Sequence, residues 1–121
     1  LGPTLSITPS STSSKIIISW SGGVFLGGGN QGNKIGMIGL WNETTDTMVS
    51  MGRVGANLSN SSDDFGQHVT IAGWDSPSST DAQVYTLQAG RYSGTYDNTI
   101  EINPDSGFGP RTNMYAMEVS G

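Results

Sequence analysis

Turn-forming residues interrupt every apolar run of this 121-residue chain, most clearly between Ile71 and Glu101. A short apolar run stops at Asp75-Ser76-Pro77, a second ends in a Gly/Ser/Tyr/Asn stretch, and a third contains Ile100 and Ile102. Short β-branched or aromatic runs separated by such residues are typical of strands joined by tight turns. No segment of ten residues carries the apolar period of a helix. The chain is therefore expected to be all-β.

The spacing of the runs predicts one domain over residues 1–121, a single antiparallel β-sandwich, jelly-roll-like, of about eight strands. Residues 34–41 and 47–51 are expected to form a hairpin. Because residues 34–41 are apolar on both faces, that strand is expected to be central in its sheet. The glycine-rich segment 21–33 and the polar segment 53–67 are expected to be loops.

The core is expected to be formed by apolar residues of these strands, beginning with the β-branched run at residues 15–20. Some runs are apolar on both faces, so not every member can be buried. The expected core residues are Ile16, Ile18, Trp20, Ile35, Met37, Trp41, Ile71, Trp74, Val84, Leu87, Ile100, Ile102, Met117 and Val119.

Charge and composition exclude several classes of function. The net charge is −5 and the five basic residues are scattered, whereas nucleic-acid binding needs a basic patch for phosphate contacts. The chain has no cysteine, so a disulfide framework and a thiolate zinc site are both impossible. No apolar run approaches the ~20 residues of a membrane helix. We therefore expect no nucleic-acid partner and no insertion into a membrane.

Few residues of the chain are candidates for catalysis or for metal binding. His68 is the single histidine, with Asp63 and Asp64 nearby, but the chain has no G-x-S-x-G elbow, and an ordinary strand histidine is the simpler interpretation. Asp75 and Asp105 sit in turn sequences, where an aspartate usually caps the backbone.

The glycine-rich segment 27–32 precedes Lys34 but lacks the G-K-S/T of a phosphate loop. A calcium site at Asp63-Asp64 or at Asp97-Asn98 would lack the ligand spacing of known calcium loops. We expect no enzymatic activity, no cofactor and no metal.

Aromatic residues in two polar segments are the candidate binding residues. Such rings can stack on sugars while neighbouring guanidinium groups hydrogen-bond to hydroxyl or carboxylate oxygens. Alternatively, the rings attach the loops to the sandwich or lie in a subunit contact. The candidate residues for receptor or glycan binding are Arg91, Tyr92, Tyr96, Phe108 and Arg111.

Short motifs in the C-terminal half resemble a recurrent stretch in tail-fibre and other virion structural proteins of bacteriophages, especially marine ones. The matching residues are Asp75-Ser76-Pro77-Ser78-Ser79-Thr80, Tyr85-Thr86-Leu87-Gln88, Ile100-Glu101-Ile102-Asn103 and Met117-Glu118-Val119. The N-terminal half carries no such motif.

The resemblance implies a non-enzymatic structural domain on the surface of a virion. Domains of this kind are often trimeric, so the expected partners are two further copies of the chain, other virion proteins and a glycan of the host surface. A tail-fibre or spike domain that contacts the host is the first interpretation. A capsid decoration or head-fibre protein is the second, and a carbohydrate-binding module of a secreted protein is the third.

Overall fold

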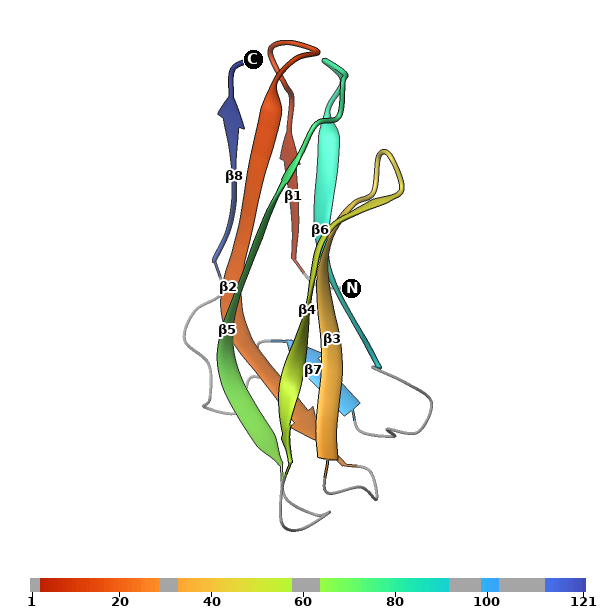
Figure 1. The fold of residues 1–121 in the computed structure, drawn as a ribbon, viewed down its shortest axis with the longest axis vertical. Coiled ribbons are helices and arrows are strands. Elements are labelled where there is room, and N and C mark those ends of the chain that lie inside the picture. The colour runs from red at the N-terminus through yellow and green to blue at the C-terminus, as the bar shows by residue number, and fades with distance from the viewer. Residues whose placement is uncertain (1–2, 29–32, 58–63, 92–98, 103–112) are drawn as a thin grey trace.

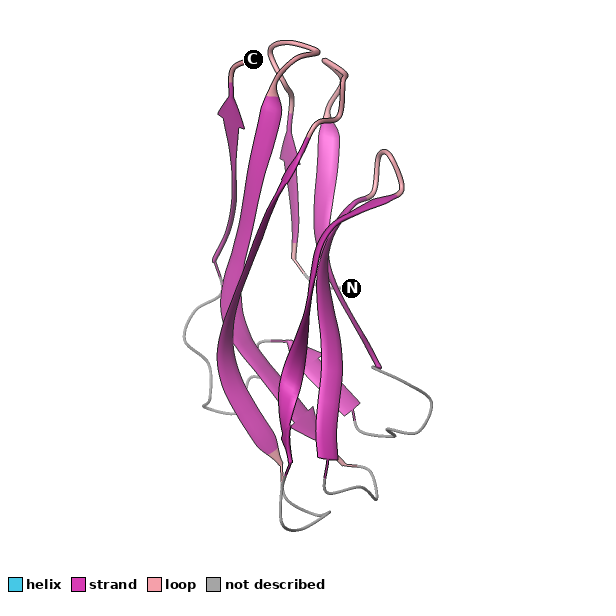
Figure 2. Ribbon diagram, viewed as in Figure 1, coloured by secondary structure: helices cyan, strands magenta, loops and turns pink. Residues whose placement is uncertain are grey.

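The computed structural model describes residues 3–28, 33–57, 64–91, 99–102 and 113–121. In these residues all regular secondary structure is β and there is no helix (Figures 1 and 2). The strands are β1 (Thr4–Ile7), β2 (Lys15–Gly27), β3 (Asn33–Asn42), β4 (Thr47–Asn57), β5 (Phe65–Asp75), β6 (Gln83–Arg91), β7 (Thr99–Ile102) and β8 (Asn113–Val119).

The strands form two antiparallel sheets that pack against each other, which confirms the predicted β-sandwich. Sheet one has the order β1-β6-β3-β4, so β3 is central, as expected from its two apolar faces. In sheet two, β2 pairs with β5 along one edge and with both β7 and β8 along the other. The hairpin expected from residues 34–41 and 47–51 is present as β3 and β4.

Three strands extend into segments that were expected to be loops, residues 21–33 and 53–67. β2 continues through Ser21–Gly27, β4 continues to Asn57, and β5 begins at Phe65 rather than at His68. The inward alternation of β2 passes through its glycines to Val24 and Leu26, both of which are buried. Glycine weakens a strand, but β5 pairs with this whole stretch of β2 and keeps it extended.

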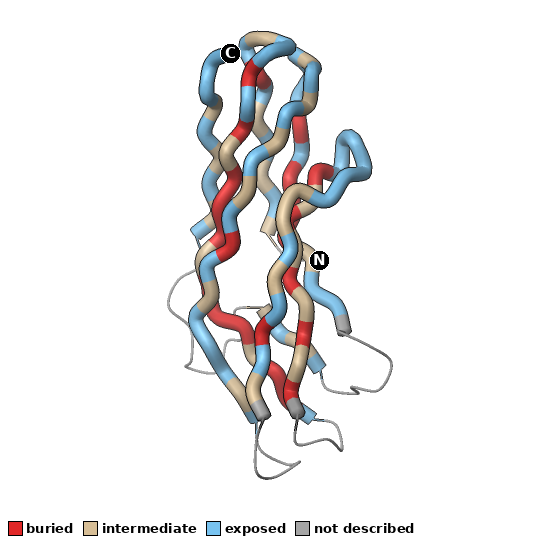
Figure 3. Tube along the Cα trace, viewed as in Figure 1, coloured by how far each residue is buried: buried red, intermediate tan, exposed pale blue. Residues whose placement is uncertain are grey.

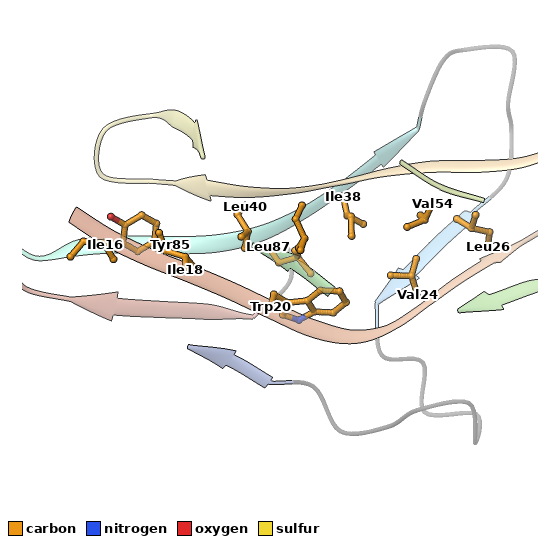
Figure 4. Packing of buried hydrophobic residues seen from close by; sticks show 11 residues of the cluster. Ile16, Ile18, Trp20, Val24, Leu26, Ile38, Leu40, Val54, Tyr85 and Leu87 are labelled. Carbon is orange, nitrogen blue, oxygen red and sulfur yellow. The ribbon is translucent and has the colours of Figure 1, made fainter. Parts of the chain in front are cut away.

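The core lies between the two sheets along the length of β2 (Figures 3 and 4). Five of the expected core residues are buried, namely Ile16, Ile18, Trp20, Ile71 and Leu87. The remaining buried apolar residues are Val24, Leu26, Ile38, Leu40, Val54 and Tyr85.

The inward face of several strands was predicted wrongly. In β3 the buried apolar side chains are Ile38 and Leu40, whereas Ile35, Met37 and Trp41 are only half-buried. Ile100 and Ile102 are half-buried beside the core. Where both faces are apolar, the period of a strand fixes the alternation but not which set points inward. The expected core residues that are instead exposed are Trp74, Val84, Met117 and Val119.

A buried polar network links the two sheets at one end of the core. Asn42 Nδ2 donates to Asp75 Oδ2 over 2.7 Å and to Gln83 Oε1 over 3.1 Å. The Tyr85 hydroxyl donates to the same Asp75 oxygen over 3.0 Å. Burial, and then the contact with Asp75, raise the pKa of Tyr85 because both disfavour the phenolate. The Asp75 carboxylate therefore joins β5 to the opposite sheet, rather than capping the turn that follows it as expected.

Candidate interaction surfaces

The binding residues suggested by the sequence fall outside the described part of the chain. Tyr92, Tyr96, Phe108 and Arg111 lie in residues 92–98 and 103–112, and the Arg91 side chain at the end of β6 is likewise not described. Their role in receptor binding stays a prediction.

The strands that hold these two segments are described. β7 ends with Ile102 opposite Val24, and β8 begins with Asn113 opposite Ser21. Only Gly22 and Gly23 of β2 separate these two pairs. β7 and β8 thus pair with the same edge of β2.

His68 lies on the outer face of sheet two, where its Nε2 is 2.7 Å from Ser21 Oγ. The Ser21 hydroxyl is also 3.0 Å from Thr70 Oγ1, so three side chains form an exposed polar row across β2 and β5. Among the described residues the imidazole makes no further hydrogen bond, and His68 pairs with Gly23 in the regular β2–β5 ladder. This arrangement is a polar contact between side chains of two paired strands.

The lysine that follows the glycine-rich segment lies within β3. Lys34 is completely buried, and its ammonium donates to the Gly28 carbonyl oxygen. The Gly28 amide in turn donates to Asp64 Oδ1 over 3.3 Å. Lys34 is therefore engaged within the protein and is not positioned to hold a phosphate. Within the described ranges, no group of three or more His, Asp or Glu side chains is placed to hold a metal ion.

A hollow in the outer face of sheet one is the first candidate surface. We call it the methionine hollow, and its volume is about 220 Å³. Its floor is open because Gly39 and Gly90 have no side chains. A Cβ atom built at Gly90 would meet no atom within 4 Å. Its walls come from three neighbouring strands and comprise Met37, Trp41, Met48, Met51 and Gln88.

Local sequence features place these walls. The register of β3 and β4 shifts after Leu40, so that Val49 is an extra residue and Met48 lies opposite Trp41. The Trp41 indole N–H donates to Asp46 Oδ1 over 3.2 Å, which fixes the ring at the rim of the hollow. Asp46 has a φ of 54°, a conformation that aspartate tolerates at the end of a hairpin turn.

The opposite rim of the methionine hollow carries a second carboxylate. Glu43 Oε1 accepts a hydrogen bond from Thr86 Oγ1 over 2.7 Å and one from Gln88 Nε2 over 2.9 Å. These two bonds, that from Thr86 foremost, lower the pKa of Glu43 below its usual value because they stabilise the carboxylate. The hollow is thus mainly apolar inside and has the acidic side chains of Asp46 and Glu43 at its edge.

The outer face of sheet two is the second candidate surface. Its centre is Trp74, which is 62% exposed and lies opposite Ile17. On the other side of Ile17 lies Met117, and Lys15 Nζ is 4.8 Å from the centroid of the Trp74 ring. We call this surface the Trp74 face, and it comprises Lys15, Ile17, Trp74, Tyr115, Met117 and Val119.

Neither surface was found by sequence reasoning, which assigned Trp41, Trp74 and Met117 to the core. The alternation of β8 did not reveal which of its faces points to the core. Met114, Ala116 and Glu118 alternate with Tyr115, Met117 and Val119, and only one of these sets can face inward. Glu118 belongs to the inward set, and its carboxylate accepts hydrogen bonds from the backbone amide and the hydroxyl of Ser10, both over 2.7 Å.

Comparison of the chain with protein-family models, with curated proteins and with solved structures found no match. In the described part of the chain, no helix is long and apolar enough to cross a membrane.

Proposed function

We propose that this chain is a non-enzymatic structural domain that assembles with copies of itself, most simply as a trimer, in the tail fibre or spike of a bacteriophage. Its place would be the virion surface, where residues of the 92–98 and 103–112 segments contact the host. Two further copies of the chain, neighbouring virion proteins and a host-surface glycan are the proposed partners. The phage context is supported by the C-terminal motifs alone.

The assembly part of this proposal rests on one observation, the exposure of large apolar side chains on strand faces. Trp74 is 62% exposed, Tyr115 is 56% exposed and Met117 is 53% exposed on sheet two. On the opposite face of the molecule, Met51 is 55% exposed and Met48 is 50% exposed. Soluble monomers rarely carry apolar patches of this kind on both sides, whereas subunits bury them in contacts.

Sedimentation of the purified domain tests the assembly. Three chains per particle at micromolar concentration is the expected result. A stable monomer over the same range would contradict self-assembly and favour the second candidate function below.

Host contact is tested separately by adsorption of virions or domain to host cells. Changing Tyr92→Ala and Tyr96→Ala together should abolish adsorption without changing the sedimentation behaviour. Unchanged adsorption would remove the receptor role and favour a capsid decoration or head-fibre protein, which binds the shell instead of the host.

The methionine hollow supports carbohydrate binding as a second candidate function. Trp41 offers a ring of fixed orientation, and Gln88 and the two rim carboxylates offer polar partners for hydroxyl groups. A carbohydrate-binding module should be monomeric and should bind a defined sugar on a glycan array. Loss of that binding in Trp41→Ala would assign the sugar to the hollow.

A further inference from the structure

Trp41 and Trp74 lie back to back, on opposite outer faces of the sandwich and at the same level along it. Their neighbours Asn42 and Asp75 point inward from opposite sheets and share a hydrogen bond of 2.7 Å. Because successive strand residues point to opposite sides, each tryptophan points away from this bond. The methionine hollow and the Trp74 face are therefore the two sides of one cross-section of the molecule.

The two surfaces differ in shape in a complementary way. Trp74 is exposed on the surface of sheet two, whereas the opposite face is hollowed over Gly39 and Gly90. The volume of about 220 Å³ is below the ~300–1,000 Å³ of pockets for drug-sized ligands, and it suits a single large side chain. Methionine walls adapt readily to an aromatic ring, because the thioether chain is flexible and makes favourable contacts with ring edges.

The two surfaces also carry opposite charges. Lys15 lies against the Trp74 ring, so a cation accompanies the exposed indole. Asp46 is bonded to the Trp41 wall and Glu43 to the Gln88 wall, so carboxylates stand on both sides of the hollow. Insertion of the indole into the hollow of another copy would bring Lys15 toward these carboxylates, whereas two Trp74 faces brought together would oppose two lysines.

We propose that the Trp74 face of one copy docks into the methionine hollow of the next copy, with Trp74 in the hollow and Lys15 beside Asp46 and Glu43. This contact joins two different surfaces, so it propagates from copy to copy around a ring or along a filament. Because the two surfaces lie at the same level of the sandwich, successive copies need little shift along its long axis. A ring such as the proposed trimer closes only if each copy is also rotated relative to the one before it, and without that rotation the copies form a filament. The inference rests on the self-assembly proposed above and identifies the surfaces that carry it.

Mixing of two blocked variants tests this contact. Trp74→Ser removes the inserted side chain, and Gly90→Leu fills the hollow at a position where a side chain meets open space. Each variant alone should sediment as a monomer, with self-association weakened by at least about tenfold. Their equimolar mixture should form heterodimers, because one copy keeps Trp74 and the other keeps the hollow.

The outcomes separate the failure of this inference from the failure of self-assembly. If Trp74→Ser dissociates the particle while Gly90→Leu does not, like faces pair with each other and the inference is wrong, although self-assembly stands. The same holds if neither variant changes the particle, or if the mixture forms no heterodimer. If the unaltered chain is monomeric, self-assembly and the inference both fail. Coincident circular dichroism spectra and melting curves establish that each variant is folded.

The salt dependence of association is a second test. It uses substitutions that change the charge of a side chain but hardly change its size. Asp46→Asn with Glu43→Gln removes both rim charges while keeping side-chain size and a residue that tolerates the hairpin turn. Added salt should weaken association of the unaltered chain and have much less effect on this double variant. An equal salt response in both proteins would show that Lys15 does not meet this rim, which contradicts the proposed docking.

Discussion

Gly55 occupies a backbone conformation in β4 that other residues adopt with strain. Its φ is 155°, and a Cβ atom there would collide with the Lys34 carbonyl oxygen and lie 2.9 Å from Ile35 Cα. We expect Gly55→Ala to lower the free energy of unfolding by ~1–3 kcal/mol. Denaturant unfolding measures this change.

Gly90→Ala is the matched control for this change, because its Cβ would meet nothing within 4 Å. It should leave stability unchanged or raise it by up to ~1 kcal/mol. Equal losses in the two variants would contradict the proposed strain at Gly55.

The alternation within β2 gives a second prediction at the scale of single residues. Ile18 is fully buried in the core, whereas its neighbour Ile17 points to the outer face between Trp74 and Met117. Ile18→Ala should cost ~2–5 kcal/mol of unfolding free energy because it removes buried methyl groups and leaves a cavity. Ile17→Ala should cost much less in the isolated chain. Chemical melts of both variants decide whether the inward face has been assigned correctly.

The hydrogen-bonded carboxylate of Glu43 should make the free energy of unfolding depend on pH. Its pKa in the folded state is lowered by hydrogen bonds from Thr86 and Gln88, so the ionised form favours folding. This contribution is fully present above the pKa that Glu43 has in the unfolded chain, and it is lost as the pH falls through the lower folded-state pKa. The stability difference between the unaltered chain and Glu43→Gln should therefore be present at neutral pH and vanish in acid. Urea melts across this pH range measure it, and a difference independent of pH would exclude this role of Glu43.

At the scale of elements, the sequence predicts that the strands exist. It does not predict where several of them end or which of their faces points to the core. Turn residues mark where runs stop, yet Gly22 and Gly23 resemble a turn and are held in β2 by pairing with β5. That pairing is a long-range contact with no local signal. In β3 both faces are apolar, and in β8 the inward face even includes Glu118, so only the position in the sandwich decides which face is covered.

The same ambiguity explains why the outer surfaces were missed. An exposed tryptophan and a core tryptophan on a strand have the same local sequence pattern. Trp20 and Trp74 each follow β-branched or small residues, but Trp20 is buried and Trp74 is exposed. The charged neighbour Lys15 lies beside Trp74 only through the pairing of β2 with β5.

At the scale of the whole molecule, one core joined across both sheets predicts one cooperative unfolding transition. If the outer faces associate as proposed, unfolding is coupled to dissociation, and the melting temperature should rise with protein concentration. Scans over a hundredfold range of concentration, roughly from micromolar upward, measure the effect. A melting temperature that does not depend on concentration would be the behaviour of a monomer. Trp74→Ser provides the control, because it should remove the concentration dependence while leaving the core intact.

β7 and β8 pair with the same edge of β2, and this fixes the two ends of the segment between them. Ile102 and Asn113 are held at partner positions three residues apart on β2, a span of about 10 Å. The ten intervening residues, 103–112, could reach roughly three times that distance if extended. The sandwich therefore sets where this connection begins and ends but not its length or composition. New sequences can therefore be tried between β7 and β8 without redesign of the core.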